Sequence, residues 1–456
     1  MPAQQAPRPS INLAVLAQRY ATLLRAVYLV CIVIATLMHP GFDASLPHML
    51  ERLRRAVQPE LRFTDFVDAA RNVALFFGWG ATYVLTARAP TTRRDVVMAT
   101  VSGLLASVTV ESAQLFAAYR QASVIDVWTN TVGSLCGAVV LAAVEHRAIG
   151  SMRRGTLIGV PGWFPASALL LMAVGLTFAP SARRTLTIAS MPSPTGRLEA
   201  VLQAPVAEMS WPSLVVDAVA WLAVGLAVAM TVSDRTGRLR SRQLLAWLVI
   251  APGSLAMTHV GRMLFGLQRE GGAPLVQGVA LGLGLAAGLA GVPLWRQRVT
   301  ARSTRAAQLG LLVVMVGAAI AWTPASWAVD AAGAGPAVRW QQFVPMFSLA
   351  TTNGMSSVFL VLQRAGLGAA IGACLAARKR LGAPVPGLRS VVAFAAVLEL
   401  GQVVVPGRYA DITDVLMTVA AAGLVLALVE RADRGPDELE AASVVALNRS
   451  PHAGRF

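Results

Sequence analysis

Apolar stretches of about 20 residues alternate with polar connections along nearly the whole chain. An α-helix of about this length crosses the hydrocarbon core of a bilayer, because each residue advances the helix by about 1.5 Å. Twelve stretches meet this criterion, at residues 22–39, 72–89, 95–116, 124–145, 158–179, 212–232, 243–265, 276–295, 306–328, 355–377, 388–405 and 411–430. The pattern predicts an all-α fold, a polytopic membrane helix bundle of about 12 transmembrane helices.

The composition favours a membrane protein over a soluble domain. Of the 456 residues, 55% are hydrophobic and 14% are charged, whereas soluble domains carry about 25% charged residues. The formal net charge of +16 does not require a nucleic-acid partner, because arginine orients membrane loops. We therefore expect the lipid bilayer as a partner and no nucleic acid. Cys31, Cys136 and Cys374 lie inside apolar stretches, so no disulfide framework is predicted.

Arginines set the predicted orientation. The connections after the second, fourth, sixth, eighth and tenth stretches are basic, as in "TARAPTTRRD" and "EHRAIGSMRRG". The positive-inside rule places them, and both termini, on the cytoplasmic side of a bacterial-type inner (plasma) membrane. The long connection before the second stretch also holds arginines, but long loops cross largely regardless of charge. No small-residue cleavage site follows the first stretch, so we expect it to be retained.

The lengths of the connections repeat with a period of about 145 residues. Each block of four stretches has a long outward connection, a short basic inward one and a short outward one with a single arginine. This rhythm predicts three four-helix repeat units, over residues 1–148, 149–300 and 301–432, followed by a cytoplasmic polar tail, 433–456. In the middle unit the repeat depends on spacing alone.

One polar motif occurs in both the first and the last unit. In "VESAQLFAAYRQASVIDVWTN" the polar residues are Glu111, Gln114, Arg120, Asp126 and Asn130. In "LELGQVVVPGRYADITDVLMT", 288 residues further on, the equivalents are Glu399, Gln402, Arg408 and Asp414, with Asp411 nearby and Thr418 at the position of the asparagine. The middle unit reads "THVGRMLFGLQREGGAPLVQG" at the corresponding place and lacks these acidic residues.

The motif is expected to gather polar side chains at the outer boundary of the membrane. Glu111 and Gln114 share a helical face at the outer end of the third stretch, and Asp126 and Asn130 share one at the start of the fourth. Such groups facing lipid would be unfavourable by several kcal/mol, so they should face the bundle interior or water. Two readings stay open: Arg120 bridges Glu111 and Asp126 to pin the hairpin, or the cluster binds the headgroup of a lipid or glycan.

The segment "ESAQLFAAYRQASVIDVWTNTVGSLCG" resembles the signature of the VanZ-like family, in which E-x-x-Q, an arginine and D-x-x-x-N-x-x-G span a helical hairpin. Upstream, "DAARNVALFFGWG" is similar to that family's D-x-x-x-N-x-x-x-F-x-P-x-G segment. Asp68, Asn72, Phe76 and Gly80 match it, and Gly78 stands where the family usually has proline. The resemblance makes Asp68 and Asn72 further candidate site residues.

The resemblance covers residues 22–145 and, more weakly, 306–430, where Leu360 replaces the upstream asparagine. It implies an integral membrane protein of the cell envelope. The family is named for a protein linked to low-level teicoplanin resistance, so a connection with glycopeptide resistance or surface polysaccharide is implied, and a lipid-linked glycan or headgroup is the implied partner. No reaction is firmly assigned to the family, so the resemblance implies no mechanism.

Two other classes stay open. Twelve stretches are also typical of a secondary transporter, although transporter sites lie near the midplane rather than at the outer boundary. A membrane enzyme acting on a lipid-linked substrate could use Glu111 and Asp126 as an acid/base pair. The five histidines are scattered, with His259 and Arg262 able to line the middle unit, and none has metal-ligand or catalytic spacing. We therefore predict no catalytic residue, metal or cofactor, and the oligomeric state is not indicated.

Overall fold

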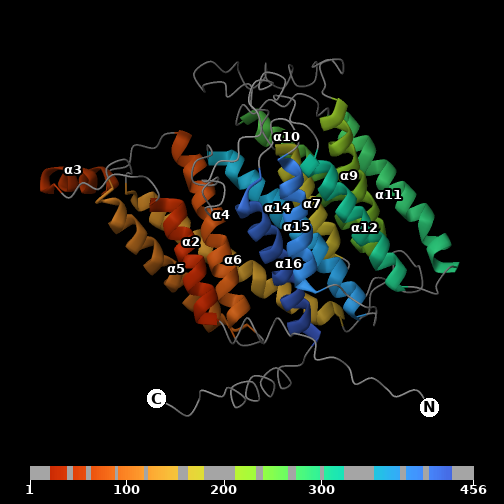
Figure 1. Ribbon diagram of the computed structural model, residues 1–456, viewed down its shortest axis with the longest axis horizontal. Coiled ribbons are helices and arrows are strands. Elements are labelled where there is room, and N and C mark those ends of the chain that lie inside the picture. The colour runs from red at the N-terminus through yellow and green to blue at the C-terminus, as the bar shows by residue number, and fades with distance from the viewer. Residues whose placement is uncertain are drawn as a thin grey trace, which may run out of the picture.

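The part of the chain described by the computed structural model consists of α-helices. It comprises residues 21–37, 45–57, 63–87, 91–117, 122–152, 163–178, 211–232, 240–264, 274–297, 302–322, 354–380, 387–403 and 410–433. Its thirteen helices are α2 (Ala21–Leu37), α3 (Leu46–Val57), α4 (Phe63–Thr86), α5 (Arg93–Gln114), α6 (Val124–Met152), α7 (Trp163–Phe178), α9 (Trp211–Val232), α10 (Ser241–Leu264), α11 (Pro274–Gln297), α12 (Arg302–Trp322), α14 (Gly354–Arg380), α15 (Leu388–Gln402) and α16 (Ile412–Asp433) (Figure 1). The all-α fold is confirmed for these residues.

Each of the twelve apolar stretches overlaps with one of these helices, but the region before the second stretch differs from the expectation. It was expected to be a long loop, and it contains α3 instead. In addition, α4 begins at Phe63, before the predicted start at residue 72. Asp68 and Asn72 therefore lie within the helix rather than at its edge. The expected polar tail, 433–456, lies outside the described residues from 434 onward.

Five described helices contain a segment that is long and apolar enough to cross a membrane. These are Arg93–Gln114, Val124–Arg147, Ser241–Val260, Leu360–Arg380 and Ile412–Glu430. Five others contain shorter apolar segments, at Ala21–Val33, Trp163–Thr177, Val215–Met230, Leu275–Gly291 and Leu309–Ala319. The protein is thus a membrane protein, and five of the twelve expected spans meet the criterion of length and composition within the described residues.

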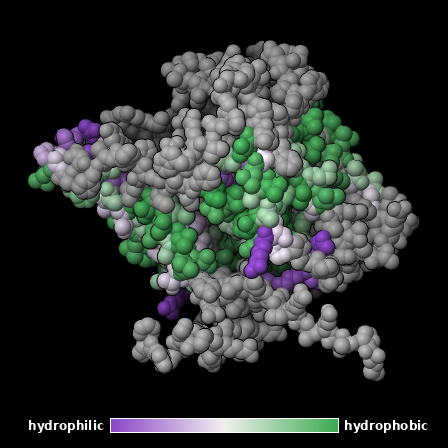
Figure 2. Space-filling model, in the orientation of Figure 1, coloured by the Kyte–Doolittle hydropathy of each residue, from purple (hydrophilic) through white to green (hydrophobic). Residues whose placement is uncertain are grey.

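The outer surface of the bundle is largely hydrophobic. On α5 the exposed side chains include Val101, Leu105 and Val108, and on α10 they include Val249 and Met257. Figure 2 shows hydrophobic residues over much of the described surface, whereas hydrophilic residues gather at helix ends and on α3. An apolar exterior of this extent would be unfavourable in water, and it matches the hydrocarbon environment of a bilayer.

The core lies around α14, which packs against α7, α12 and α16. Trp221 of α9 is fully buried there and donates from Nε1 to Thr177 Oγ1 of α7 over 3.0 Å. Buried aliphatic residues such as Leu169 and Leu367 fill the surrounding space. A second, smaller cluster joins α4, α5 and α6 to α16 through Leu141 and Leu428. The first and last parts of the chain therefore share a packed boundary.

Glycine lets four helix pairs bring their backbones into close contact: α4 with α6, α9 with α11, α14 with α16, and α14 with α7. A Cβ atom at Gly137 would lie 2.0 Å from the Phe77 carbonyl oxygen, and one at Gly284 would lie 2.2 Å from that of Leu222. At Gly368 the corresponding distance to the Thr418 carbonyl oxygen is 2.1 Å. Only a residue without a side chain allows such backbone contact, as is common between membrane helices.

Replacement of Gly284 by alanine is expected to destabilise the protein by about 1–3 kcal/mol, because the added methyl group overlaps the backbone of α9. The matched control is Gly282→Ala in the same helix, where an added Cβ meets nothing within 4 Å. That change should be neutral or stabilising by up to about 1 kcal/mol, since alanine favours helix. Thermal unfolding in detergent, followed by tryptophan fluorescence, compares the two, and equal midpoints would contradict the close contact.

Candidate functional site

In the N-terminal hairpin a carboxylate closes the turn between α5 and α6. Glu111 is buried near the end of α5, and its Oε2 accepts the backbone N–H of Ser123 over 2.9 Å. Ser123 in turn accepts the N–H of Ile125 through its hydroxyl over 3.1 Å. These bonds satisfy backbone donors at the start of α6 that have no partner within the helix itself. The glutamate therefore fixes where the second helix of the hairpin begins.

Two amide side chains complete the buried part of this hairpin. Asn130 of α6 is 2% exposed, and its Nδ2 donates to Ser107 Oγ of α5 over 2.9 Å. Its Oδ1 is also buried, and it has no hydrogen-bond partner within the described part of the chain. Gln114 is buried and lies 3.5 Å from the Thr36 carbonyl oxygen of α2, at the limit of a hydrogen bond. A buried acceptor without a partner is uncommon and marks a place where a ligand or water can bind.

The remaining candidates of this hairpin are described only in part. Asp126 lies in the first turn of α6 and is half-buried, as is Asn72 of α4. Arg120 lies outside the described residues, and so does Arg408 of the second motif. Asp68 is placed within α4, but its side chain is not described. The bridge from Arg120 to Glu111 and Asp126, which was one of the two open readings, and the place of Arg408 in the second cluster therefore stay predictions.

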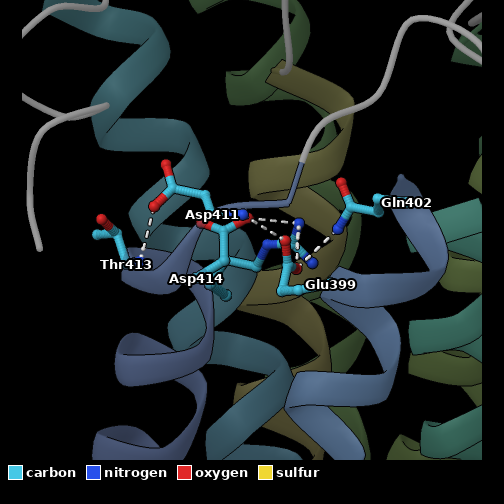
Figure 3. A network of polar contacts seen from close by, with 6 residues as sticks. Glu399, Gln402, Asp411, Thr413 and Asp414 are labelled. Atoms are coloured by element: carbon cyan, nitrogen blue, oxygen red, sulfur yellow. Dashed lines mark hydrogen bonds and ion pairs between the residues drawn. The ribbon is translucent and has the colours of Figure 1, made fainter. Parts of the chain in front are cut away.

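The C-terminal hairpin repeats the same bonds (Figure 3). Glu399 Oε2 accepts the backbone N–H of Asp411 over 3.2 Å, and Asp411 Oδ1 accepts the N–H of Thr413 over 2.7 Å. Gln402 Nε2 donates to Glu399 Oε1 over 2.7 Å. The partner of each glutamate lies twelve residues further along the chain, and the capped N–H two residues beyond that. The structure thus brings Glu399, Gln402, Asp411 and Asp414 together, as the motif predicts.

An arginine that the sequence reasoning missed lies at the centre of this second cluster. Arg364 of α14 is 4% exposed, and its Nη2 lies 2.6 Å from Asp414 Oδ2 and 3.2 Å from Glu399 Oε1. It comes from a third helix, 35 residues before Glu399 in the chain, so the spacing of the motif does not reveal it. The available signal is the occurrence of a charged residue within the apolar run of α14, because such residues usually have a specific partner.

The two hairpins differ at the position of this arginine. The residue 288 positions before Arg364 is Phe76, which is fully buried in α4. The asparagine pair differs as well, since Thr418 stands in place of Asn130 and Ala395 in place of Ser107. In the C-terminal hairpin α14 therefore supplies a guanidinium to the carboxylates, whereas in the N-terminal hairpin α4 supplies an aromatic ring at that position. The two hairpins thus share the hydrogen bonds that close their turns, while their buried polar side chains differ.

The middle of the chain holds a third polar cluster, which the motif comparison did not predict. Gln277 of α11 donates from Nε2 to Asp217 Oδ2 of α9 over 2.9 Å, and its Oε1 lies 2.7 Å from His259 Nε2 of α10. All three side chains are buried. Because the amide NH₂ points to Asp217, its oxygen must accept from His259, so Nε2 of the imidazole carries a proton. The sequence marked His259 and Arg262 only as residues able to line this interior, and the side chain of Arg262 is not described.

Sequence repeats did not locate this cluster because its residue types differ from those of the motif. As in the C-terminal hairpin, the side chains come from three helices joined in chain order, here α9, α10 and α11. An aspartate in the apolar run "SLVVDAVAWLAVG" was the one signal available. In the part of the chain that the structure describes, no three His, Cys, Asp or Glu side chains gather as metal ligands.

Apolar helices with buried polar groups at the ends of helical hairpins define a polytopic α-helical membrane protein. Residues 25–145 match the family model described as VanZ/LLP1, a span that contains α4, α5, α6 and the N-terminal hairpin. Residues 25–145 are thus similar to the VanZ-like family, and the match falls on the unit where the resemblance is clearer. No curated protein and no solved structure matches the chain.

Replacement of Arg364 by leucine is expected to destabilise the protein by about 3–5 kcal/mol, because it leaves two buried carboxylates without their cation. The matched control is Lys379→Gln, which removes the more exposed pair between Lys379 and Glu430 at 2.5 Å. Loss of that pair should change stability by no more than about 1 kcal/mol. Thermal unfolding in detergent is the measurement.

The variant that combines Arg364→Leu with Glu399→Gln and Asp414→Asn should recover most of the lost stability, because it removes all three buried charges together. If the single Arg364→Leu variant unfolded at the wild-type temperature, the ion-paired cluster would be of no consequence for the fold.

Proposed function

We propose that this protein binds the headgroup of a lipid or of a lipid-linked glycan with its N-terminal hairpin, at the extracytoplasmic boundary of the membrane. The observation that carries the proposal is the buried Asn130 Oδ1, which has no hydrogen-bond partner among the described residues although its amide group is held by Ser107. A ligand can therefore donate a hydrogen bond to Asn130 Oδ1. Hydroxyl and amino groups of headgroups and sugars are such donors.

The neighbouring side chains suit a ligand of this class. The buried Glu111 and the half-buried Asp126 flank Asn130 along the same hairpin. Carboxylates and amides at the end of a helical hairpin would lie at the level of lipid headgroups, where a polar group can approach from water while its lipid remains in the bilayer. Gln114 of α5 and the half-buried Asn72 of α4 are further amides of the same unit. The unit that resembles the VanZ-like family therefore offers several carboxylates and amides to such a ligand.

The C-terminal hairpin has a structural role in this proposal. Arg364 forms ion pairs with both Glu399 and Asp414, and Gln402 and the backbone of Asp411 donate hydrogen bonds to Glu399. Although Arg364 Nε and Asp414 Oδ1 make no hydrogen bond among the described residues, the cluster carries its own cation, and its contacts fix the packing of α14, α15 and α16. The pinning interpretation of the motif therefore fits the last unit, and the binding interpretation fits the first.

The packing supports the proposed arrangement in three four-helix units. Close glycine contacts join α4 with α6, α9 with α11, and α14 with α16, which correspond to the second and fourth apolar stretches of the units 1–148, 149–300 and 301–432. A further glycine contact joins α14 to α7 and so links the last unit to the middle one. Polar clusters lie at the ends of all three third helices. With basic connections in the cytoplasm, these ends face outward and both termini face inward. The protein would then be a cell-envelope protein of the inner membrane, with a role in glycopeptide resistance or surface polysaccharide.

The variants Glu111→Gln and Glu399→Gln separate binding from folding. Glu111→Gln should leave the unfolding temperature near the wild-type value, because glutamine can still accept from Ser123, and should weaken retention of bound lipid about tenfold, as for the loss of a hydrogen bond to a charged group. Glu399→Gln should lower stability, because Arg364 loses one of two carboxylates, and should keep lipid retention. Native mass spectrometry of the purified protein measures retained lipid.

In cells, teicoplanin susceptibility at matched protein abundance provides the functional readout. Asn130→Leu and Glu111→Gln should both change susceptibility, and Thr418→Val, at the position equivalent to Asn130, should not. If all three variants equalled the wild type in lipid retention and susceptibility, the N-terminal hairpin would be structural only.

The middle cluster favours a second candidate, a secondary transporter coupled to protons. Asp217, Gln277 and His259 form a continuous chain of hydrogen bonds between two titratable groups inside a helix bundle. Buried acidic and imidazole groups within membrane helices are typical of proton pathways. The amide of Gln277 links the two groups, so a change of protonation at one of them would reverse its preferred orientation and affect the other.

Transport would be detected as uptake of radiolabelled amino acids or sugars by purified protein in sealed vesicles with an imposed proton gradient. Asp217→Asn should abolish the dependence of uptake on the gradient, because the carboxylate can no longer exchange a proton. Thr177→Val on α7, which removes the hydroxyl that binds Trp221, is the control and should retain it. If uptake were the same with and without the proton gradient, and the same in wild type and Asp217→Asn, proton coupling would be rejected.

A further inference from the structure

The helix α3 has one hydrophobic face without a partner in the described structure. Leu46, Leu50, Leu53 and Val57 follow at intervals of four, three and four residues, which places them on one side of the helix. Their exposed fractions lie between 48% and 65%. A short helix with four exposed aliphatic residues in a row would be unstable in water, so this face is expected to be covered by an apolar environment.

The position of α3 indicates which environment that is. In Figure 1, α3 lies across the direction of the long helices and extends away from the bundle beside α5. Arg52 holds it there, because its Nη1 donates to the Leu115 carbonyl oxygen over 2.9 Å. Leu115 is the residue after the last one of α5, a helix long and apolar enough to cross a membrane. The helix α3 therefore lies at the level of the membrane boundary and parallel to its surface.

The charges of α3 complement the phosphate groups of lipids. Arg54 and Arg55 are exposed, and Arg55 is opposite the apolar face on the helix, where it pairs with Glu51 over 2.9 Å. Figure 2 shows hydrophilic residues on the upper side of α3 and hydrophobic residues on its lower side, toward the level of the hydrophobic band. A helix with an apolar face and basic residues on the other side is typical of one that lies in the headgroup region of a bilayer.

We propose that α3 is an interfacial helix that inserts Leu46, Leu50, Leu53 and Val57 into the outer leaflet and binds the phosphate groups of anionic lipids through Arg54 and Arg55. Because Leu115 follows Gln114, the lipids held by α3 lie next to the N-terminal hairpin. This inference deepens the proposed function, and the biological purpose of lipid binding by α3 rests on that function. The headgroup bound by the hairpin would then be one that is attached to a phosphate group. The insertion of α3 itself does not depend on binding at Glu111.

Site-directed spin labels test the insertion in the full chain, reconstituted in vesicles of phosphatidylcholine with phosphatidylglycerol. The native cysteines Cys31, Cys136 and Cys374 are first replaced by alanine, and single labels are then attached at Leu50→Cys or, as the matched control on the opposite face, at Arg55→Cys. The label at position 50 should be reached by oxygen in preference to a water-soluble nickel chelate, because oxygen concentrates in hydrocarbon. The label at position 55 should show the reverse preference.

Two results would overturn the proposal. Equal access of the nickel chelate to both labels would place α3 in water. Access of neither reagent to position 50 would mean that protein covers this face, as in contact with a second copy of the chain. The label pattern should be the same in Glu111→Gln, so failure of headgroup binding at the hairpin and failure of α3 to insert give different results.

The phosphate contacts are tested by the preference of the reconstituted protein for spin-labelled phosphatidylglycerol over spin-labelled phosphatidylcholine at its surface. Replacement of both Arg54 and Arg55 by glutamine should lower this preference by about fivefold for each arginine that lies close to a phosphate. Replacement of both by lysine should preserve most of it, since the charge remains. A wild-type preference in the glutamine variant would show that α3 does not bind anionic lipid.

Discussion

The requirement that buried backbone and charged groups be satisfied without water shapes this structure. A membrane helix satisfies its own backbone except at its ends, where the first donors and last acceptors lack partners. In both hairpins a glutamate at the end of one helix accepts the backbone N–H of the residue that precedes the next helix, Ser123 or Asp411. The side chain of that preceding residue in turn accepts an N–H from the first turn of the next helix. This hydrogen bond gives a partner both to a backbone N–H of the turn and to the buried carboxylate itself.

The same solution leaves room for divergence between the units. The bond that closes the turn uses one carboxylate oxygen, so the second oxygen and the neighbouring amides can bind other side chains or a ligand. In the C-terminal unit Arg364 takes up this capacity, and the cluster becomes part of the core. In the N-terminal unit a phenylalanine occupies that position and Asn130 keeps an acceptor without a described partner. The middle of the chain has a different buried cluster, in which α9, α10 and α11 supply an acid, an imidazole and an amide.

Hydropathy and motif spacing predict much of this, and their failures have physical causes. An average over 20 residues finds helices that are apolar all round, but in α3 the leucines and arginines cancel, so the helix is missed. The motif identifies Glu111 and Asp126 because both belong to one hairpin, and it misses Arg364 because packing of α14 alone brings that residue to Glu399. A search for repeats of the motif misses Asp217, Gln277 and His259, since their residue types differ from those of the motif.

The bond from Glu111 to Ser123 also has a consequence for biosynthesis. Until the segment around Ser123 has emerged from the ribosome, the carboxylate of α5 has no backbone donor to bind, and entry of α5 alone into lipid would expose an ionised group to hydrocarbon. Co-translational insertion is therefore favoured when α5 and α6 enter the bilayer together as a hairpin. The spacing of twelve residues between Glu111 and Ser123 would then determine how much of the chain has to emerge before α5 can enter the bilayer.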